Sequence, residues 1–273
     1  MLQVSHLFIY PIKSLGGIAK QSVEITATGF KHDRRWMLVD DQNMFLTQRA
    51  HPQMALLQVG ENSSGIFVYH KQHPLQSITI PFSMAYANKI SVTIWDDVCD
   101  ALEADEEVND WFSDMLHINC KLVHMPDDTR RLVDKKYAAN NEITSFSDAY
   151  PILIIAQASL DNLNEKLSDA LPMNRFRPNI VFTGGHAHIE DEMAAFTIEG
   201  INFLGVKPCS RCVMTTIDQQ TAAGGKEPLR TLAGYRMKNN KIYFGQNVLQ
   251  QQTGKIKIGD EIKIIKQQEA YIR

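Results

Sequence analysis

The sequence lacks the features of exported, membrane-spanning or nucleic-acid-binding proteins. It has only four cysteines among 273 residues, and 28 basic side chains against 31 acidic ones leave a net charge of −3. No apolar run approaches the roughly 20 residues that cross a bilayer, and the first residues lack the layout of a signal peptide. We therefore expect a cytoplasmic monomer with reduced cysteines, no membrane segment and no nucleic-acid partner.

Short stretches in which apolar and polar residues alternate recur along the chain. Val23, Ile25 and Ala27 are the first example, as in a half-buried strand. The polar run 40–43 separates two strand-like segments, 36–39 and 44–47, and predicts a hairpin; alternating isoleucines over 256–264 predict another. The expected fold is mostly β and barrel-like with a few α-helices. Other strand-like segments are 66–69, 77–80, 89–95, 120–124, 152–156, 180–183, 196–198, 201–206 and 213–217.

Three segments favour helices. In 105–116 the apolar residues fall on one face and acidic residues stand at the start. Ser159 is expected to cap a second helix that ends near residue 167, and 227–235 predicts a short third one. The polar segment 126–150 shows little periodicity. We place a domain boundary before it, so that two β-rich domains, 1–125 and 126–273, enclose a cleft.

Two cysteines three positions apart, Cys209 and Cys212, form the most informative motif, with Arg211 between them. A redox dithiol needs a helix N-terminus, but the β-branched segment 213–217 favours a strand. Structural zinc needs four ligands, and only His186 and the nearby His188 could complete such a site. Two alternatives remain open: a pair of inert buried cysteines, or one thiolate that binds a soft metal beside nearby cations.

A second segment places two arginines two positions apart, Arg175 and Arg177, before Pro178 and Asn179. Pro178 should push Arg177 into an extended conformation, so that both arginines point the same way. Guanidinium groups in this arrangement suit a phosphate or carboxylate, although a surface pair leading into a strand is the alternative.

Two smaller clusters could also hold an anion. Lys13 and Ser14 precede a flexible Gly-Gly pair, but the glycine spacing is not that of a Walker loop. Asp33 and Arg34 begin a strand-like segment. In isolation, such a cluster is more often a charged patch on the surface than a functional site.

Together these motifs resemble the MOSC-domain proteins that carry an N-terminal β-barrel domain, the group of the mitochondrial amidoxime-reducing component and its bacterial counterparts. The resemblance covers nearly the whole chain. It rests on Tyr10-Pro11-Ile12-Lys13-Ser14, Asp33-Arg34-Arg35-Trp36, Phe146-Ser147-Asp148, Arg175-Phe176-Arg177-Pro178-Asn179-Ile180, Cys209-Ser210-Arg211-Cys212-Val213-Met214-Thr215-Thr216-Ile217-Asp218 and Phe244-Gly245-Gln246-Asn247.

The resemblance implies a molybdenum cofactor, Mo–molybdopterin, in the cleft between the domains. Cys212 would be the thiolate bonded to the metal, with Cys209 a neighbour and not a ligand. Asp148 would lie in the active-site wall, as a candidate proton relay. The residues implied to hold the pterin and its phosphate are Lys13, Ser14, Arg34, Arg177, Asn179, Ser210 and Arg211.

The implied activity is that of an oxidoreductase that removes oxygen from N-hydroxylated substrates: amidoximes, hydroxylamines and N-hydroxylated bases. Electrons would come from a separate protein, either ferredoxin-like or a b-type cytochrome with an NAD(P)H reductase, because the chain has no appended ferredoxin-like domain. Tyr150 stands where small hydroxyl residues are expected and could reshape the pocket. The alternatives are a cofactor carrier or sulfur-transfer module, and a binding protein that has lost its metal.

Overall fold

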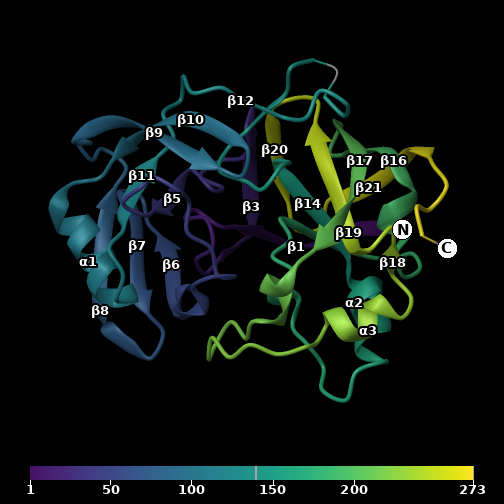
Figure 1. Cartoon of the computed structure of the whole chain (residues 1–273). Coiled ribbons are helices and arrows are strands. Elements are labelled where there is room, and N and C mark those ends of the chain that lie inside the picture. Colours follow the sequence, from purple (N-terminus) through teal and green to yellow (C-terminus); the bar gives the residue numbers. More distant parts are fainter. Residues whose placement is uncertain (139, 273) are drawn as a thin grey trace.

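The computed structural model describes residues 1–138 and 140–272, and it is built mainly from short strands (Figure 1). The described part of the chain contains three α-helices, namely α1 (Glu106–Leu116), α2 (Gln157–Asn164) and α3 (Leu229–Ala233). The expectation of a mostly β fold with a few helices is therefore confirmed. No helix among these residues is both long and apolar enough to span a bilayer.

Seven strands of the described chain close into a barrel. Hydrogen-bonded neighbours follow one another around the ring until the last strand pairs with the first. In ring order the strands are β14 (Ile152–Ala156), β15 (Ile180–Thr183), β1 (Leu2–Ile9), β21 (Glu261–Gln267), β16 (Met193–Ile198), β17 (Ile201–Arg211) and β19 (Lys241–Gln250). The strands β2 (Ile18–Lys20) and β18 (Met237–Lys238) pair with β1 and β19.

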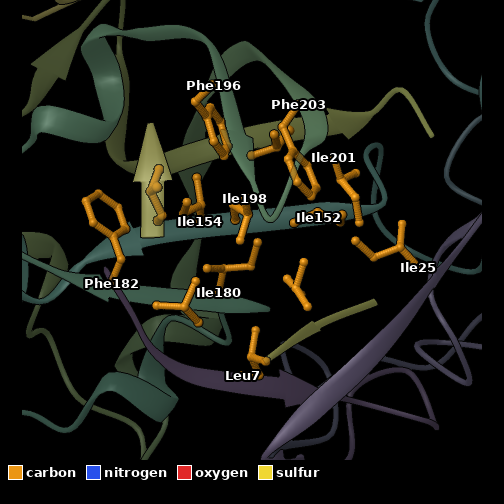
Figure 2. Close-up of a cluster of buried hydrophobic side chains, with 14 of the residues drawn as sticks. Leu7, Ile25, Ile152, Ile154, Ile180, Phe182, Phe196, Ile198, Ile201 and Phe203 are labelled. Carbon is orange, nitrogen blue, oxygen red and sulfur yellow. The ribbon is translucent and has the colours of Figure 1, made fainter. Parts of the chain in front are cut away.

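The barrel is filled by large apolar side chains (Figure 2). Phe196 and Phe203 stack with ring centroids 5.3 Å apart, and Phe182 is fully buried in the same cluster. Strand β14 reads Ile-Leu-Ile-Ile-Ala and is buried on both faces, which explains its lack of alternation. This packing gives the cleft a rigid wall.

Outside the barrel, the first half of the chain forms smaller sheets, one of which also includes a strand from the end of the chain. Helix α1 begins after Asp105, whose carboxylate accepts a hydrogen bond from the Val108 N–H, and it buries Val108, Phe112 and Leu116. The sheets are β5 (Trp36–Val39), β11 (Lys121–His124), β10 (Asp97–Glu103) and β9 (Asn88–Ile94); β6 (Leu57–Glu61), β7 (Gly65–His70) and β8 (His73–Pro81); and β20 (Gly254–Lys257), β3 (Ser22–Thr26) and β4 (Gly29–Phe30).

The two ends of the chain cross between these parts. β1 lies in the barrel with strands from the second half of the chain, whereas β20 pairs with β3 of the first half. The predicted tail hairpin is therefore wrong, because β21 pairs with β1 and β16. Alternation identified the tail strands but carried no information about their partners. The domain boundary between residues 125 and 126 stays a prediction. Strands from the two sides of this boundary pair with each other in the same sheets.

Three other local predictions are wrong. Residues Val213–Thr216 form a 3-10 turn and not a strand. Ser159 lies inside α2, where its hydroxyl donates to Glu190, so it does not cap the helix. Arg175 ends another 3-10 turn and Arg177 has a φ of 55°, so neither lies in an extended segment. In each case contacts from elsewhere in the fold outweigh the local preference.

The segment 126–150 is mostly irregular, with one short ladder between β12 (Arg131–Leu132) and β13 (Ile143–Thr144). Buried Arg131 donates to the carbonyls of Ser145 and Ser147 at 2.9 and 2.5 Å. It also pairs with Asp97 at 2.8 Å. Arg131 thereby ties this loop to the first half of the chain and fixes the wall on which the site is built.

Candidate active site

One cleft is lined by residues from both halves of the chain. All nine residues to which the sequence assigned a role in the site line it: Lys13, Ser14, Arg34, Asp148, Arg177, Asn179, Ser210, Arg211 and Cys212. Tyr150 also lines the cleft, as do Cys209 and Asn247.

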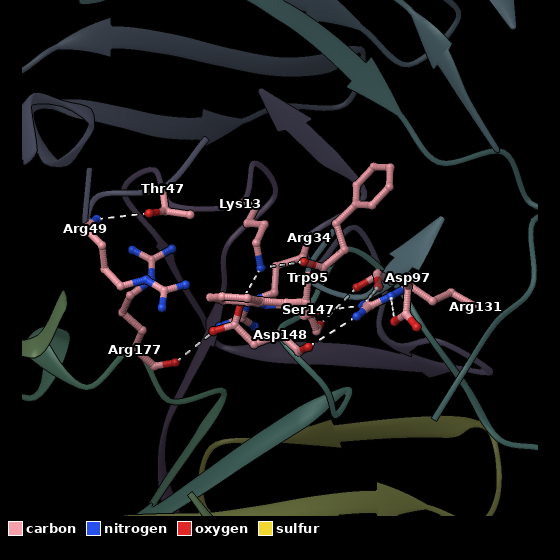
Figure 3. A network of polar contacts seen from close by, with 12 residues as sticks. Lys13, Arg34, Thr47, Arg49, Trp95, Asp97, Arg131, Ser147, Asp148 and Arg177 are labelled. Carbon is pink, nitrogen blue, oxygen red and sulfur yellow. Dashed lines mark hydrogen bonds and ion pairs between the residues drawn. The ribbon is translucent and has the colours of Figure 1, made fainter. Parts of the chain in front are cut away.

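Lys13 and Asp148 form an ion pair across the cleft wall, with Nζ and Oδ1 2.5 Å apart (Figure 3). Burial lowers the pKa of Lys13 to about 8, and Asp148 opposes that shift. Burial would raise the pKa of Asp148, but the charge and hydrogen bond of Lys13 outweigh it and hold that pKa well below its usual range. The Asp148 side chain is 65% exposed, so solvent screens the pair. Asp148 therefore orients Lys13, and its role as a proton relay stays a prediction.

Arg34 is fully engaged by the protein. Its guanidinium donates to buried Asp33 at 2.5 Å and to the Asn179 side-chain oxygen at 3.2 Å. Burial opposes its charge, but Asp33 outweighs this and raises the pKa of Arg34. Asn179 accepts from the Leu153 N–H and donates to the Phe8 carbonyl, each at 3.2 Å. Both side chains therefore shape the cleft more than they offer free donors to a ligand.

Arg177 differs, because among the described residues its guanidinium has no hydrogen-bond or ion-pair partner. It is only 7% exposed, and its Nη2 is buried without an acceptor. Its one side-chain contact of note is the Tyr10 ring, 4.2 Å from the guanidinium carbon. Burial lowers the pKa of Arg177 to about 10. The carboxylates of Asp33 and Asp148 act on it without a direct contact. A buried cation that no carboxylate contacts is costly, so the position is suited to an anionic ligand.

Three of the site residues have left-handed backbone. Ser14, Arg34 and Arg177 have φ of 68°, 51° and 55°. Such conformations are uncommon for residues other than glycine and cost of the order of 1 kcal/mol or more each. The buried hydroxyl of Ser14 also has no hydrogen-bond partner in the described protein. Strained backbone beside polar atoms without partners is typical of a preorganised ligand site.

The cysteine motif lies at the end of β17. Cys212 directly follows the strand and begins the 3-10 turn Val213–Thr216. Arg211 donates to the Cys209 sulfur at 2.9 Å, so it orients that thiol. Cys209 is half-buried, whereas Cys212 is exposed in the cleft. Of the two, Cys212 is the sulfur that a bound ligand can reach.

Hydrogen bonds of Gln219 hold the segment after Cys212 against the first half of the chain. The side-chain amides of Gln48 and Gln219 exchange hydrogen bonds, at 2.9 and 3.3 Å, although both are buried. Gln48 also donates to the Ser14 carbonyl at 2.6 Å, and Lys71 donates to the Gln219 carbonyl at 2.5 Å. These hydrogen bonds connect the Ser14 loop with the segment that follows Cys212.

Sequence reasoning missed three residues that contact the lining residues of the site. Tyr10 stacks on two arginines, Arg131 donates to the Asp148 carbonyl at 3.2 Å, and Trp95 donates to the Asp148 carboxylate at 3.2 Å. Tyr10 and Arg131 lie in the motif 10–14 and in the polar segment 126–150, so proximity in sequence hinted at them. Nothing local distinguishes Trp95 from a strand residue.

The site as a whole has four cations, one carboxylate and one accessible thiol. No cluster of three or more His, Cys, Asp or Glu side chains suited to a metal occurs in the described chain. A metal here would need ligands that a bound group brings with it. The free Arg177, the buried hydroxyl of Ser14 and the soft Cys212 sulfur fit a phosphate-bearing group with a soft metal.

Comparison with known proteins gives matches over both halves of the chain. Residues 1–119 match the MOSC N-terminal beta barrel domain, and residues 141–263 match the MOSC domain. The chain is 28% identical to mitochondrial amidoxime-reducing component 1 of Mus musculus, over 97% of this chain and 82% of the relative. It is 29% identical to mitochondrial amidoxime reducing component 2 of Bos taurus, over 95% and 82%. It is also 28% identical to the molybdenum cofactor sulfurase of Caenorhabditis elegans, over 89% of this chain but 32% of that protein.

Proposed function

Because the chain belongs to the MOSC family, with a MOSC N-terminal β-barrel domain followed by a MOSC domain, we propose that it is a molybdenum-cofactor-dependent oxidoreductase that reduces N-hydroxylated substrates. The observation that carries the proposal is the pairing, in one cleft, of buried Arg177, which no carboxylate of the described residues contacts, and the exposed thiol of Cys212. The names of the relatives, amidoxime-reducing components, supply the substrate class.

The chain's own residues divide the work of holding the cofactor. Cys212 provides the soft ligand for molybdenum, and Arg177, Ser14 and Arg211 provide donors for the phosphate and the pterin. Lys13 is held in place by Asp148. When bound, the cofactor supplies a two-electron centre that can accept an oxygen from an N–O bond. Asp148 keeps Lys13 oriented, and its role as a proton relay is part of the same proposal.

The electron donor is part of the same proposal: a separate ferredoxin-like protein, or a b-type cytochrome with an NAD(P)H reductase. The cytoplasmic location expected from the sequence stays a prediction, since the relatives are named as mitochondrial proteins. Likeness to the sulfurase gives the carrier or sulfur-transfer function as the second candidate.

The test is to produce the chain in a host that makes the molybdenum cofactor. Molybdenum and pterin per chain are then measured for the wild type, Cys212→Ser and the matched control Cys209→Ser. Turnover of benzamidoxime is followed with a reduced dye as the electron donor. We expect near one molybdenum per wild-type chain, and loss of turnover in Cys212→Ser but not in the control.

Two other outcomes have distinct meanings. Metal that is bound but passed on to an acceptor apoenzyme, without turnover, would favour the carrier function. A wild-type chain that holds neither molybdenum nor pterin would overturn both functions and leave a metal-free binding protein.

A further inference from the structure

Trp95 occupies a backbone position that normally favours glycine. It is the first residue of the two-residue turn between β9 and β10, where Ile94 pairs with Asp97, and its φ is 55°. Two-residue hairpin turns with positive φ at this residue prefer glycine there, and a bulky residue in this conformation is an outlier. Other contacts must therefore hold the indole in place, and strain of this kind concentrates at functional sites.

Those contacts place Trp95 at the rim of the cleft, next to its lining residues but not among them. Its Nε1 donates to Oδ1 of Asp148, a lining residue, at 3.2 Å, and the Phe45 ring packs against it edge-on at 4.8 Å. The Arg49 guanidinium carbon lies 4.1 Å from the centroid of the indole. Figure 3 shows Trp95, Asp148 and Arg49 in one close-up, in which the dashed line from Arg49 goes to Thr47. The indole remains 39% exposed, so part of its surface is available to a ligand.

The charge of Arg49 is not balanced by the protein. Among residues 1–138 and 140–272, its guanidinium forms no ion pair or hydrogen bond; only its backbone N–H does, to the Thr47 hydroxyl at 3.1 Å. Asp148, which accepts the indole N–H, is already paired with Lys13. A guanidinium that lies on an indole keeps its N–H edge free for an acceptor. The rim therefore presents an apolar surface beside an unpaired cation.

We propose that Trp95 and Arg49 form a substrate subsite that favours flat, conjugated N-hydroxylated compounds bearing a carboxylate or another anionic group. The indole packs against the flat part of the substrate, and Arg49 pairs with its anionic group. This subsite rests on the proposed reductase function and gives it a substrate class. Aliphatic substrates use the same cleft without the indole contact, and uncharged aromatic substrates use it without the pairing to Arg49.

The experiment compares two matched substrates, benzamidoxime and 4-carboxybenzamidoxime, which differ in one carboxylate. It uses the cofactor-loaded protein with Arg49→Gln, Trp95→Gly and the control Arg230→Gln, which removes an exposed arginine paired only with Glu227. Glycine suits the φ of 55°, so Trp95→Gly should fold, and its melting temperature verifies this.

We expect the wild type to have the lower KM for the carboxylated substrate. Arg49→Gln should raise that KM about tenfold, the size of one charge-assisted hydrogen bond, while the KM for benzamidoxime changes less than twofold. Trp95→Gly should raise both KM values, because the packing surface for the flat part of both substrates is lost. The control should alter neither.

Equal KM values for the two substrates in the wild type, or equal effects of Arg49→Gln on both, would overturn the subsite. A second readout separates this failure from that of the reductase function. The products benzamidine and 4-carboxybenzamidine are titrated against the tryptophan fluorescence of the wild type and Arg49→Gln. If the wild type turns over neither amidoxime, the reductase proposal fails, and this titration still shows whether Arg49 prefers the carboxylated ligand.

Discussion

Arg236 and Arg177 are both buried, but the protein treats their charges in opposite ways. Arg236 is 3% exposed and lies 2.5 Å from the carboxylate of Asp191, which is completely buried. Arg236 also donates to the Tyr243 carbonyl at 3.2 Å. Arg177, in the cleft, has a ring beneath it and no acceptor among the described side chains. A charge that the fold satisfies itself serves structure, whereas one left open is reserved for a ligand.

The cysteines repeat this contrast. Burial raises the pKa of Cys99 and of Cys120 to about 11, so both are inert thiols in the core. Cys212 is exposed in the cleft beside cationic side chains. Cys99 and Cys120 therefore behave as inert buried cysteines, whereas Cys209 and Cys212 line the cleft.

The strongest test of the comparison is Arg236→Met. It would leave Asp191 as a buried carboxyl group without its cation, which should cost about 3–5 kcal/mol of unfolding free energy. Burial already raises the pKa of Asp191 and Arg236 opposes that shift, so the variant should bind a proton there. Urea unfolding at neutral pH measures the loss.

The control is the double variant Arg236→Met with Asp191→Leu. Removal of both partners should recover much of the stability, because no unpaired charge remains. A single variant as stable as the wild type would show that the pair of Asp191 and Arg236 does not stabilise the fold. The contrast between Arg236 and Arg177 would then no longer hold.

Arg177→Met should act in the opposite direction. Methionine keeps an apolar contact with the Tyr10 ring and removes a buried cation, so the cofactor-free protein should gain on the order of 1 kcal/mol. The same change should lower the molybdenum content of protein made in a cofactor-producing host. Arg175→Met is the matched control, because Arg175 pairs with Asp218 at 2.7 Å and its loss should not stabilise the chain. A destabilised Arg177→Met variant with full metal content would contradict a ligand-binding role.

Sequence patterns predicted the elements better than their partners. The five apolar residues 152–156 and the segment 180–183 form strands as expected, because side-chain type alone decides whether a short run can be buried. The tail isoleucines gave two strands, but the hydrogen bonds of β20 go to β3. Pairing over a separation of about 230 residues leaves no local pattern.

The same limit explains what was foreseen at the site. The resemblance to MOSC-domain proteins identified its lining residues, since the motif blocks that carry the resemblance are distinctive even without a fold. Residue 95 ends the predicted strand 89–95, and nothing in that alternation places an indole on a rim shared with Asp148. Gln48 and Gln219 are likewise ordinary polar residues in the sequence, and only the fold brings their amides together.

The smallest expected effect is a pH dependence of the cofactor-free protein. Burial lowers the pKa of both Lys13 and Lys71 to about 8, whereas the unfolded chain keeps these protons until about pH 10.4. At each lysine the unfolded state therefore binds more protons than the folded state above pH 8, so the contribution of each lysine to the unfolding free energy should rise as pH increases. Burial raises the pKa of Cys99 and Cys120 to about 11 and that of Tyr10 to about 12, and these groups act in the opposite direction, so the contribution of a lysine is the difference between the wild type and its Lys→Met variant.

Urea unfolding of the wild type and of each Lys→Met variant at pH 8.0 and 9.5 should assign to each lysine a gain below about 1 kcal/mol, since solvent screens the exposed Asp148 partner. Lys13→Met should remove its part of the gain, and Lys71→Met the remainder. In cofactor-loaded protein the part that belongs to Lys13 should disappear, because an anionic ligand restores the pKa of a cation that it contacts. An unchanged slope after loading would mean that the protein alone balances the charge of Lys13, unlike that of Arg177. The cleft would then contain both a cation that the protein pairs and a cation that it leaves for a ligand.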